Sequence, residues 1–182
     1  MLSTLSRAAV LACAVTVSLS AQAPQAERIN LRYQSFDPSV SQPEVPQALR
    51  STAKMQMHIV QFAGVPTQAD RDAIVAAGGK VIGYLPVNAY VVRMTAGQAT
   101  AVGDHRSVRW IGGYQPAYRI EPELLKMQAW QNPQPVRYNI VVADKHSDKP
   151  ALANKIQAIG GTVDNEQAGS LLFPVTLTGP QL

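Results

Sequence analysis

The side chains that could do chemistry are few and lie far apart along the chain. The only imidazoles are those of His58, His105 and His146, and the last two lie beside aspartates, as Asp104–His105 and Asp144 near His146. A structural or catalytic metal needs three or four suitably spaced ligands, and neither pair has a third. Such pairs in loops are mostly solvated surface, so we expect no metal site and no bound cofactor.

Other patterns that mark catalytic sites are misplaced or incomplete. Gly78-Gly79 follows a predicted helix, whereas glycines that cradle a phosphate precede one. Gly169-Ser170 lacks the neighbouring residues that a nucleophile elbow requires. The single cysteine, Cys13, falls in a predicted leader, so the mature chain would carry no thiol. The sequence therefore favours a binding protein over an enzyme.

Composition permits a folded core and disfavours a nucleic-acid partner. The 182 residues are 46% hydrophobic and 15% charged, which suits one ordinary domain or two small ones. The net charge is +4, but the sixteen lysines and arginines are scattered along the chain. Nucleic-acid-binding domains cluster basic residues and interleave aromatic ones, so we expect no nucleic acid among the partners.

The N-terminal region predicts export and then a linker. Residues 1–23 have a basic start at Arg7, an apolar stretch at 8–19 and small residues at the end, the three parts of a secretory signal peptide. That stretch is too short for a permanent membrane span, so we expect a secreted or periplasmic protein without membrane contact after leader removal. Residues 24–54 are polar and rich in proline, which predicts a mobile or extended linker.

Residues 55–120 predict one unit of short strands and helices. Four apolar runs bounded by glycine, proline or polar residues are typical of strands, at residues 58–62, 80–85, 88–94 and 108–111. Helices are expected after Thr67 and Thr95, whose side chains can cap a helix start. The order is βαββαβ, the ferredoxin-like pattern, and the predicted fold class is α+β. Such a fold names no activity by itself.

The same pattern begins again after a proline-rich hinge at residues 121–136. Residues 137–182 predict a strand, a helix and two further strands. Three landmarks recur at offsets of 81 to 83 residues, which indicates a tandem repeat: Ile59 with Ile140, Gly78 with Gly160, and Thr95 with Thr178. The second copy lacks its last helix and strand, so we expect a truncated unit with an unpaired strand edge, and a fragment of a longer precursor.

One face of the first predicted sheet is the candidate binding surface. Alternation places one set of side chains under the helices: His58, Val60, Phe62, Tyr90, Val92, Met94, Val108 and Trp110. The opposite, open face then carries Ile59, Gln61, Val91, Arg93, Arg109 and Ile111. An apolar patch with a polar rim is typical of an interaction surface. The alternative, of equal weight, is that the linker or the second unit covers this face.

The strands of the first unit and their flanks form three distinctive runs: HIVQFAGVP, GGKVIGYLPVNAYVVRM and VRWIGGYQPAYRIEPEL. Together these runs, within residues 55–125, resemble the N-terminal pro-region of secreted subtilisin-like serine peptidases. The three triad signatures of that family, Asp-Ser/Thr-Gly, His-Gly-Thr-His and Gly-Thr-Ser-Met-Ala, do not occur in the chain. The resemblance is therefore to the non-catalytic part of a peptidase precursor.

The resemblance implies an intramolecular chaperone and inhibitor whose sheet lies on a subtilisin-like peptidase domain. The leading hypothesis is therefore a secreted pro-region, present here without its catalytic domain. Two alternatives stay open: a free-standing exported peptidase inhibitor, and a small-ligand-binding protein with tandem βαββαβ domains. An RNA-recognition domain would need a glycine and paired aromatics in its third strand, which NAYVVRM lacks.

Overall fold

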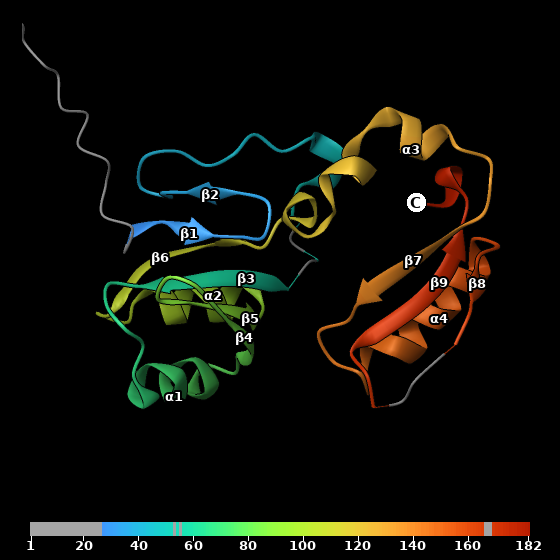
Figure 1. Cartoon of the computed structure of the whole chain (residues 1–182). Helices are drawn as coiled ribbons and strands as arrows, with labels where there is room; N and C mark the ends of the chain where they lie inside the picture. The colour runs from blue at the N-terminus through green and yellow to red at the C-terminus, as the bar shows by residue number, and fades with distance from the viewer. Residues whose placement is uncertain (1–26, 53, 55, 166–168) are drawn as a thin grey trace, which may run out of the picture.

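The computed structural model describes residues 27–52, 54, 56–165 and 169–182 (Figure 1). The predicted signal peptide, with Cys13, lies outside the described residues. Two units of strands and helices follow one another along the chain, joined by a run of short helices. The α+β class predicted from the sequence is confirmed.

The first unit has the expected order of elements. They are β3 (Met57–Phe62), α1 (Gln68–Ala76), β4 (Lys80–Leu85), β5 (Ala89–Arg93), α2 (Ala96–Gly103) and β6 (Val108–Gly113). The strands pair antiparallel in the order β4-β5-β3-β6. Both helices lie on the same face of this sheet (Figure 1). Strand β3 is therefore central, with a neighbour on each side.

Both helices of this unit begin with a capping box. The N–H of Thr67 donates to the Asp70 carboxylate at 2.7 Å, and the N–H of Asp70 donates to the Thr67 hydroxyl at 3.3 Å. Thr95 and Gln98 exchange the same two bonds at the start of α2. These bonds satisfy backbone donors that a helix start leaves free, so the predicted starts after Thr67 and Thr95 are confirmed.

The other face of the sheet is covered by the N-terminal segment, which we define as residues 27–50. Within it, β1 (Ile29–Asn30) and β2 (Ser35–Phe36) form a hairpin, and a 3-10 turn, η2, spans Gln47–Leu49. The hairpin lies over the sheet on the side away from the helices (Figure 1). Ile29, Phe36 and Val45 are buried in one cluster with Ile59 of β3. The expectation of a mobile or extended linker is wrong for this segment.

A few widely spaced apolar side chains are enough to hold the N-terminal segment on the sheet, which is why it is not a mobile linker. The Phe36 ring lies edge-on to Trp110 at 6.3 Å and 5.7 Å from the ring of Tyr118. Burial of aromatic side chains is among the largest single contributions to a core. Since these residues follow no helical or strand period, sequence patterning does not reveal them.

A β-bulge exchanges the expected positions of Trp110 and Ile111. In the pairing of β3 with β6, Trp110 lies opposite Gln61 but Val108 lies opposite Phe62, so β6 has one extra residue there. As a result Trp110 packs with the N-terminal segment, whereas Ile111 packs with Val60 and Phe62 under the helices. Simple alternation predicted the reverse for both residues, because a bulge shifts the alternation by one position.

Short helices connect the two units. They are η3 (Pro116–Arg119), η4 (Pro122–Leu125) and α3 (Met127–Gln131). The first packs Ala117 and Tyr118 into the cluster under the N-terminal segment. The Trp130 indole of α3 donates to the carbonyl of Leu124. The predicted hinge is therefore mostly helical in its first half.

The second unit has the first four elements of the same pattern. They are β7 (Val136–Val141), α4 (Asp148–Ala158), β8 (Thr162–Val163) and β9 (Leu172–Leu177), followed by the 3-10 turn η5 (Gly179–Gln181). The strand order β7-β9-β8 reproduces β3-β5-β4. Gly160 ends α4 at φ 79° as Gly78 ends α1 at φ 86°, a conformation that favours glycine. These correspondences support the predicted tandem repeat.

One landmark of the repeat is displaced by a residue. Val60 of β3 lies opposite Tyr90 and faces the helices, and Ile140 of β7 lies opposite Phe173 and packs in the corresponding core. Ile140 therefore corresponds to Val60, at an offset of 80 residues, and not to Ile59. The offset rises from 80 residues in the first strand to 82 at the glycine that follows the helix, because α4 has 11 residues and α1 has 9.

Replacing Phe36 by alanine tests whether the N-terminal segment is part of the fold. Phe36→Ala removes a ring that is 6% exposed and should lower the free energy of unfolding by about 3 kcal/mol. The matched control Val40→Ala, at a site 77% exposed, should change it by less than about 0.5 kcal/mol. Urea denaturation followed by tryptophan fluorescence measures both. Equal, small effects of the two variants would contradict the docked segment.

Candidate functional site

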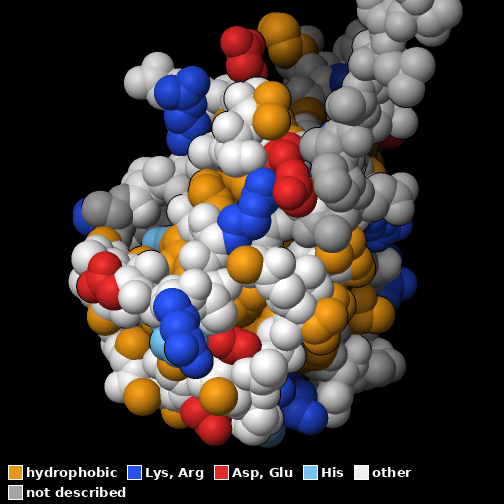
Figure 2. Space-filling view, turned by 90° about the vertical axis from the view of Figure 1, so that its left-hand side faces the viewer, with side chains coloured by type: hydrophobic (Ala, Val, Ile, Leu, Met, Phe, Trp, Pro, Cys, Tyr) orange, Lys and Arg blue, Asp and Glu red, His pale blue; other side chains and the backbone are white. Residues whose placement is uncertain are grey.

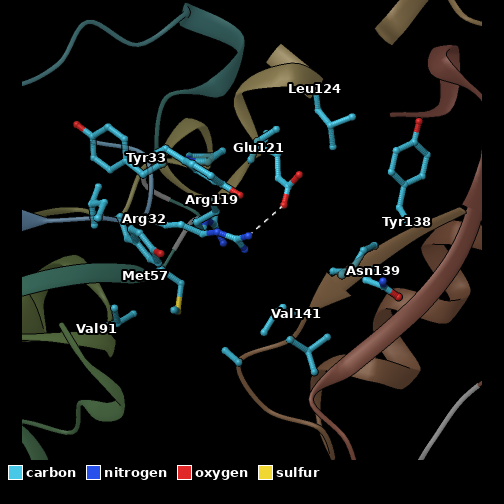
Figure 3. Close-up of a pocket in the computed structure, with 18 of the residues that line it drawn as sticks. Arg32, Tyr33, Met57, Val91, Arg119, Glu121, Leu124, Tyr138, Asn139 and Val141 are labelled. Atoms are coloured by element: carbon cyan, nitrogen blue, oxygen red, sulfur yellow. Dashed lines mark ion pairs between the residues drawn. The ribbon is translucent and has the colours of Figure 1, made fainter. Parts of the chain in front are cut away.

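A cleft of about 1090 Å³ lies between the two units. The outer strand β4 contributes residues 82–85 to one wall, and residues 137–143, which include most of β7, run along the other. Figure 3 shows Met57 and Val91 on the side of the first unit and Asn139 and Val141 facing them from the second. Both β4 and β7 are outer strands of their sheets, so two strand edges border this cleft.

The upper rim carries aromatic and charged side chains from the N-terminal segment and the connection. Arg32 and Glu121 form an exposed ion pair at 3.6 Å, drawn as a dashed line in Figure 3. The Arg119 guanidinium lies 5.5 Å from the centre of the Tyr114 ring, a cation–π arrangement. Burial raises the pKa of the Tyr114 phenol, so this side chain is neutral at physiological pH.

The lower end of the cleft is closed by two ion pairs between the units. Lys80 at the start of β4 lies 2.5 Å from Asp144, and Arg93 at the end of β5 lies 2.6 Å from Asp148. The hydrogen bond from Lys80, followed by those from the N–H groups of His146 and Ser147, lowers the pKa of Asp144. Burial raises the pKa of Asp148, but its bonds to Arg93 and to the Asp144 N–H outweigh this, and the net shift is downward. Both aspartates are therefore charged at neutral pH.

The six residues of the predicted binding surface do not form an open patch. Ile59 and Gln61 are completely buried and Val91 is 7% exposed, because the N-terminal segment and nearby side chains cover this face. Ile111 faces the helices, and Arg93 pairs with Asp148 of the second unit. The expectation of an open face in the first unit is therefore corrected in favour of the alternative, in which the chain itself covers the sheet.

The polar members of that surface anchor the N-terminal segment. Arg109 donates to the side-chain oxygen of Gln61 and to the carbonyl of Glu27, each at 2.9 Å, and to Asp37 at 3.2 Å. Hydrogen bonds from Ser39, and then from Arg109, lower the pKa of the Asp37 carboxyl. A buried charged group needs such partners to be tolerated, so Gln61 and Arg109 serve the fold in this position.

Serine, histidine and aspartate side chains meet at one place in the first unit. The Ser107 hydroxyl donates to Asp70, and the Nδ1 atom of His105 lies 2.7 Å from the same hydroxyl. In a serine-peptidase triad the histidine stands between serine and aspartate, whereas here the serine stands in the middle. The Ser107 proton is directed to the carboxylate, so the cluster is a structural link between α1 and the loop before β6.

The same hydrogen bonds hold the Asp70 carboxyl in its charged form. The bond from Ser107, followed by those from Thr67, lowers the pKa of Asp70 to about 2. In the described residues no three histidine, cysteine or carboxylate side chains gather as a metal ion would require. Among the described helices, none combines the length and apolar composition needed to cross a membrane.

Basic and acidic side chains are interspersed on the face of the molecule drawn in Figure 2, and no continuous basic area forms there. The charges that line the cleft, by contrast, come from segments far apart in the sequence. Arg32, Arg119 and Arg137 lie on three different stretches, and no sequence pattern connects them. This is why sequence reasoning missed the cleft.

Comparison with known proteins gives one family match. Residues 30–115 match the family described as "Domain of unknown function (DUF8729)". This range begins in the β1–β2 hairpin and ends just after β6, so it includes most of the N-terminal segment together with the βαββαβ unit. No curated protein and no solved structure matches the chain. The ferredoxin-like assignment consequently continues to rest on the order of the elements.

The Asp70 cluster predicts a defined pH dependence of stability. Asp70→Asn removes the charge of the capping box and should lower the free energy of unfolding at pH 7 by about 1–2 kcal/mol. Because the pKa of Asp70 falls from 3.8 to about 2 on folding, its contribution is present above pH 4 and is lost as the pH falls toward 2. The difference between wild type and variant should therefore shrink over that interval.

Thermal unfolding at a series of pH values measures this difference. Asp72→Asn is the matched control, since Asp72 lies on the exposed side of the same helix, where its carboxylate accepts a hydrogen bond from Gln68. A wild-type advantage over Asp70→Asn that stays constant down to pH 2 would rule out the carboxylate as its source.

Proposed function

We propose that this chain is the secreted pro-region of a subtilisin-like serine peptidase, which it assists in folding and inhibits by binding. The proposal draws on the resemblance of residues 55–125 to such pro-regions and on the predicted signal peptide at residues 1–23. It places the protein outside the cell or in the periplasm, with the peptidase domain as its partner. The binding surface must then be a sheet face that the chain leaves accessible.

The observation that carries the proposal is an exposed apolar pair on the second sheet. Val141 of β7 and Leu172 of β9 lie directly opposite each other and are 70% and 47% exposed. The neighbouring pairs on the same face include Arg137 with Thr176 and Asn139 with Pro174. An apolar centre with a polar rim is the composition of a protein interface.

The repeat explains why this face is open. Helix α4 covers the inner face of β7 and β9, where Ile156, Phe173 and Val175 are buried. In the first unit the opposite face is covered by the N-terminal segment. No described segment plays that part in the second unit, since Val141 and Leu172 both stay exposed. The surface predicted for the first sheet is thus accessible on the second, where its Val141 side borders the cleft between the units.

The exposed pair provides a direct test of peptidase binding. The full chain should inhibit a subtilisin-like peptidase, and the double variant Val141→Asp/Leu172→Asp should raise the inhibition constant about tenfold or more, since burial of each apolar side chain contributes about 1.5–3 kcal/mol. Val75→Asp is the matched control, because Val75 is 58% exposed on α1 of the first unit. The measurement is the initial rate of peptide hydrolysis against inhibitor concentration, with circular dichroism to verify folding.

Two outcomes would refute the proposal. One is no inhibition and no acceleration of refolding of the peptidase by the wild-type chain. The other is an equal loss from Val75→Asp and from the double variant. Milder Val141→Ser and Leu172→Ser substitutions keep the test valid if the aspartates unfold the second unit.

The same surface would serve a free-standing inhibitor, and the two possibilities differ only in where the peptidase is encoded. A pro-region predicts the three triad signatures in the same reading frame beyond Leu182. A separate inhibitor predicts that they are encoded elsewhere. Reading the genomic frame distinguishes the two.

A further inference from the structure

One arginine of the cleft has no carboxylate partner among the described residues. Four arginines line the cleft, and three of them form ion pairs: Arg32 with Glu121 at 3.6 Å, Arg93 with Asp148 at 2.6 Å, and Arg137 with Asp164 at 3.2 Å. The fourth is Arg119 of η3, whose guanidinium lies 5.5 Å from the centre of the Tyr114 ring. Arginine stays protonated in proteins. The described chain therefore leaves one positive charge in the cleft without a counterion.

Arg119 is held in place by its neighbours in η3. Ala117 and Tyr118 are buried in the cluster under the N-terminal segment, so the backbone before Arg119 is anchored to the first unit. The surrounding chain lowers the pKa of the guanidinium, because burial disfavours the charged form, yet Arg119 stays exposed to the cleft. A charged group that is already positioned loses little freedom when a partner binds.

An apolar surface lies beside this charge. Leu31, Leu49 and Tyr114 are partly buried against the cluster under the N-terminal segment, and all three also line the cleft. Met57 lines it too, and its carbonyl accepts from the Tyr114 N–H at 2.9 Å. Figure 3 shows Met57 and Arg119 on the same side of the cleft. We call these four residues the apolar floor.

The apolar floor and Arg119 include no residue of the second unit. They come from the N-terminal segment, β3, the residue after β6, and η3. Sites for small molecules are concave and mostly apolar or aromatic, with a few polar groups that fix the orientation of the ligand. The cleft, of about 1090 Å³, has room for such a ligand on this wall alone.

We propose that Arg119 and the apolar floor form a binding site for a small aromatic carboxylate. The guanidinium donates two parallel hydrogen bonds to the carboxylate, the geometry that suits this pair of groups. The aromatic body lies against the floor, where the Tyr114 ring adds a ring–ring contact. Glu121 does not compete for Arg119, since it is paired with Arg32. This site goes beyond the peptidase proposal and does not depend on it.

A pair of ligands that differ only in charge tests the role of the carboxylate. Isothermal titration calorimetry of the full chain with 2-naphthoate at low salt should give a dissociation constant of about 100 μM. The neutral 2-naphthamide has nearly the same shape and should bind about tenfold or more weakly, because it cannot form the ion pair. This difference should shrink at about 0.5 M NaCl, since mobile ions screen an exposed guanidinium.

The decisive variant removes the charge of Arg119. Arg119→Gln should weaken the binding of 2-naphthoate about tenfold or more and change that of 2-naphthamide by less than about twofold. Arg71→Gln is the matched control, because it removes the same charge from an exposed site on α1, away from the cleft lining. It should bind 2-naphthoate like wild type. Leu49→Ala should weaken both ligands alike, by about threefold, through the lost apolar contact.

Four results would overturn the proposal. The first is no saturable binding of 2-naphthoate up to about 5 mM. The second is equal affinity for 2-naphthoate and 2-naphthamide. The third is an equal loss from Arg119→Gln and Arg71→Gln while circular dichroism shows both to be folded. The fourth is tighter binding of decanoate than of 2-naphthoate, because the site would then suit an aliphatic and not an aromatic body.

Discussion

The first unit depends on the central position of β3, which has a bonded strand on each edge and a covering layer on each face. Its edges bond to β5 and β6, one face lies under the helices, and the other lies under the N-terminal segment. A strand in this position can carry apolar residues on both faces, and Ile59, Val60 and Phe62 are all buried. Hydrogen bonds from the Arg109 guanidinium also join the N-terminal segment to the sheet, so this layer is held without a disulfide.

In the second unit, the described residues cover fewer sides of the strand that corresponds to β3. Strand β7 has one paired edge and one covered face, and its side chains are correspondingly more exposed than those of β3. Because the two units are repeats, each position of β7 can be compared with the corresponding position of β3, whose partners are defined. The proposed binding surface on the outer face of the second sheet follows from that comparison.

The sequence predicted the elements well because their causes are local. Thr67 and Thr95 mark helix starts through bonds to residues three positions ahead, and Gly78 and Gly160 mark helix ends through a conformation that glycine tolerates. The tandem repeat was recognised for the same reason, since both copies preserve these boundary residues. Strand β9 was also expected despite Pro174, which is accommodated because its nitrogen is not needed for the pairing with β7.

The errors concern features whose causes lie far apart in sequence. The bulge that moves Trp110 and Ile111 to opposite faces depends on how β6 meets β3, and the burial of Ile29 and Phe36 depends on a sheet formed by later residues. The prediction of an open face had assumed strict alternation and a mobile N-terminal segment. The cleft was missed because its arginines come from separate stretches that only the complete fold brings together.

The two ion pairs at the base of the cleft make the spacing of the units sensitive to the surrounding electrolyte. Lys80 is largely exposed, whereas Arg93 and Asp148 are partly shielded from solvent. Mobile ions screen the first pair over a Debye length of about 8 Å at physiological ionic strength and affect the second less. At low salt both ion pairs would therefore hold the two sheets together. At high salt the Arg93–Asp148 pair would be the main electrostatic restraint between them.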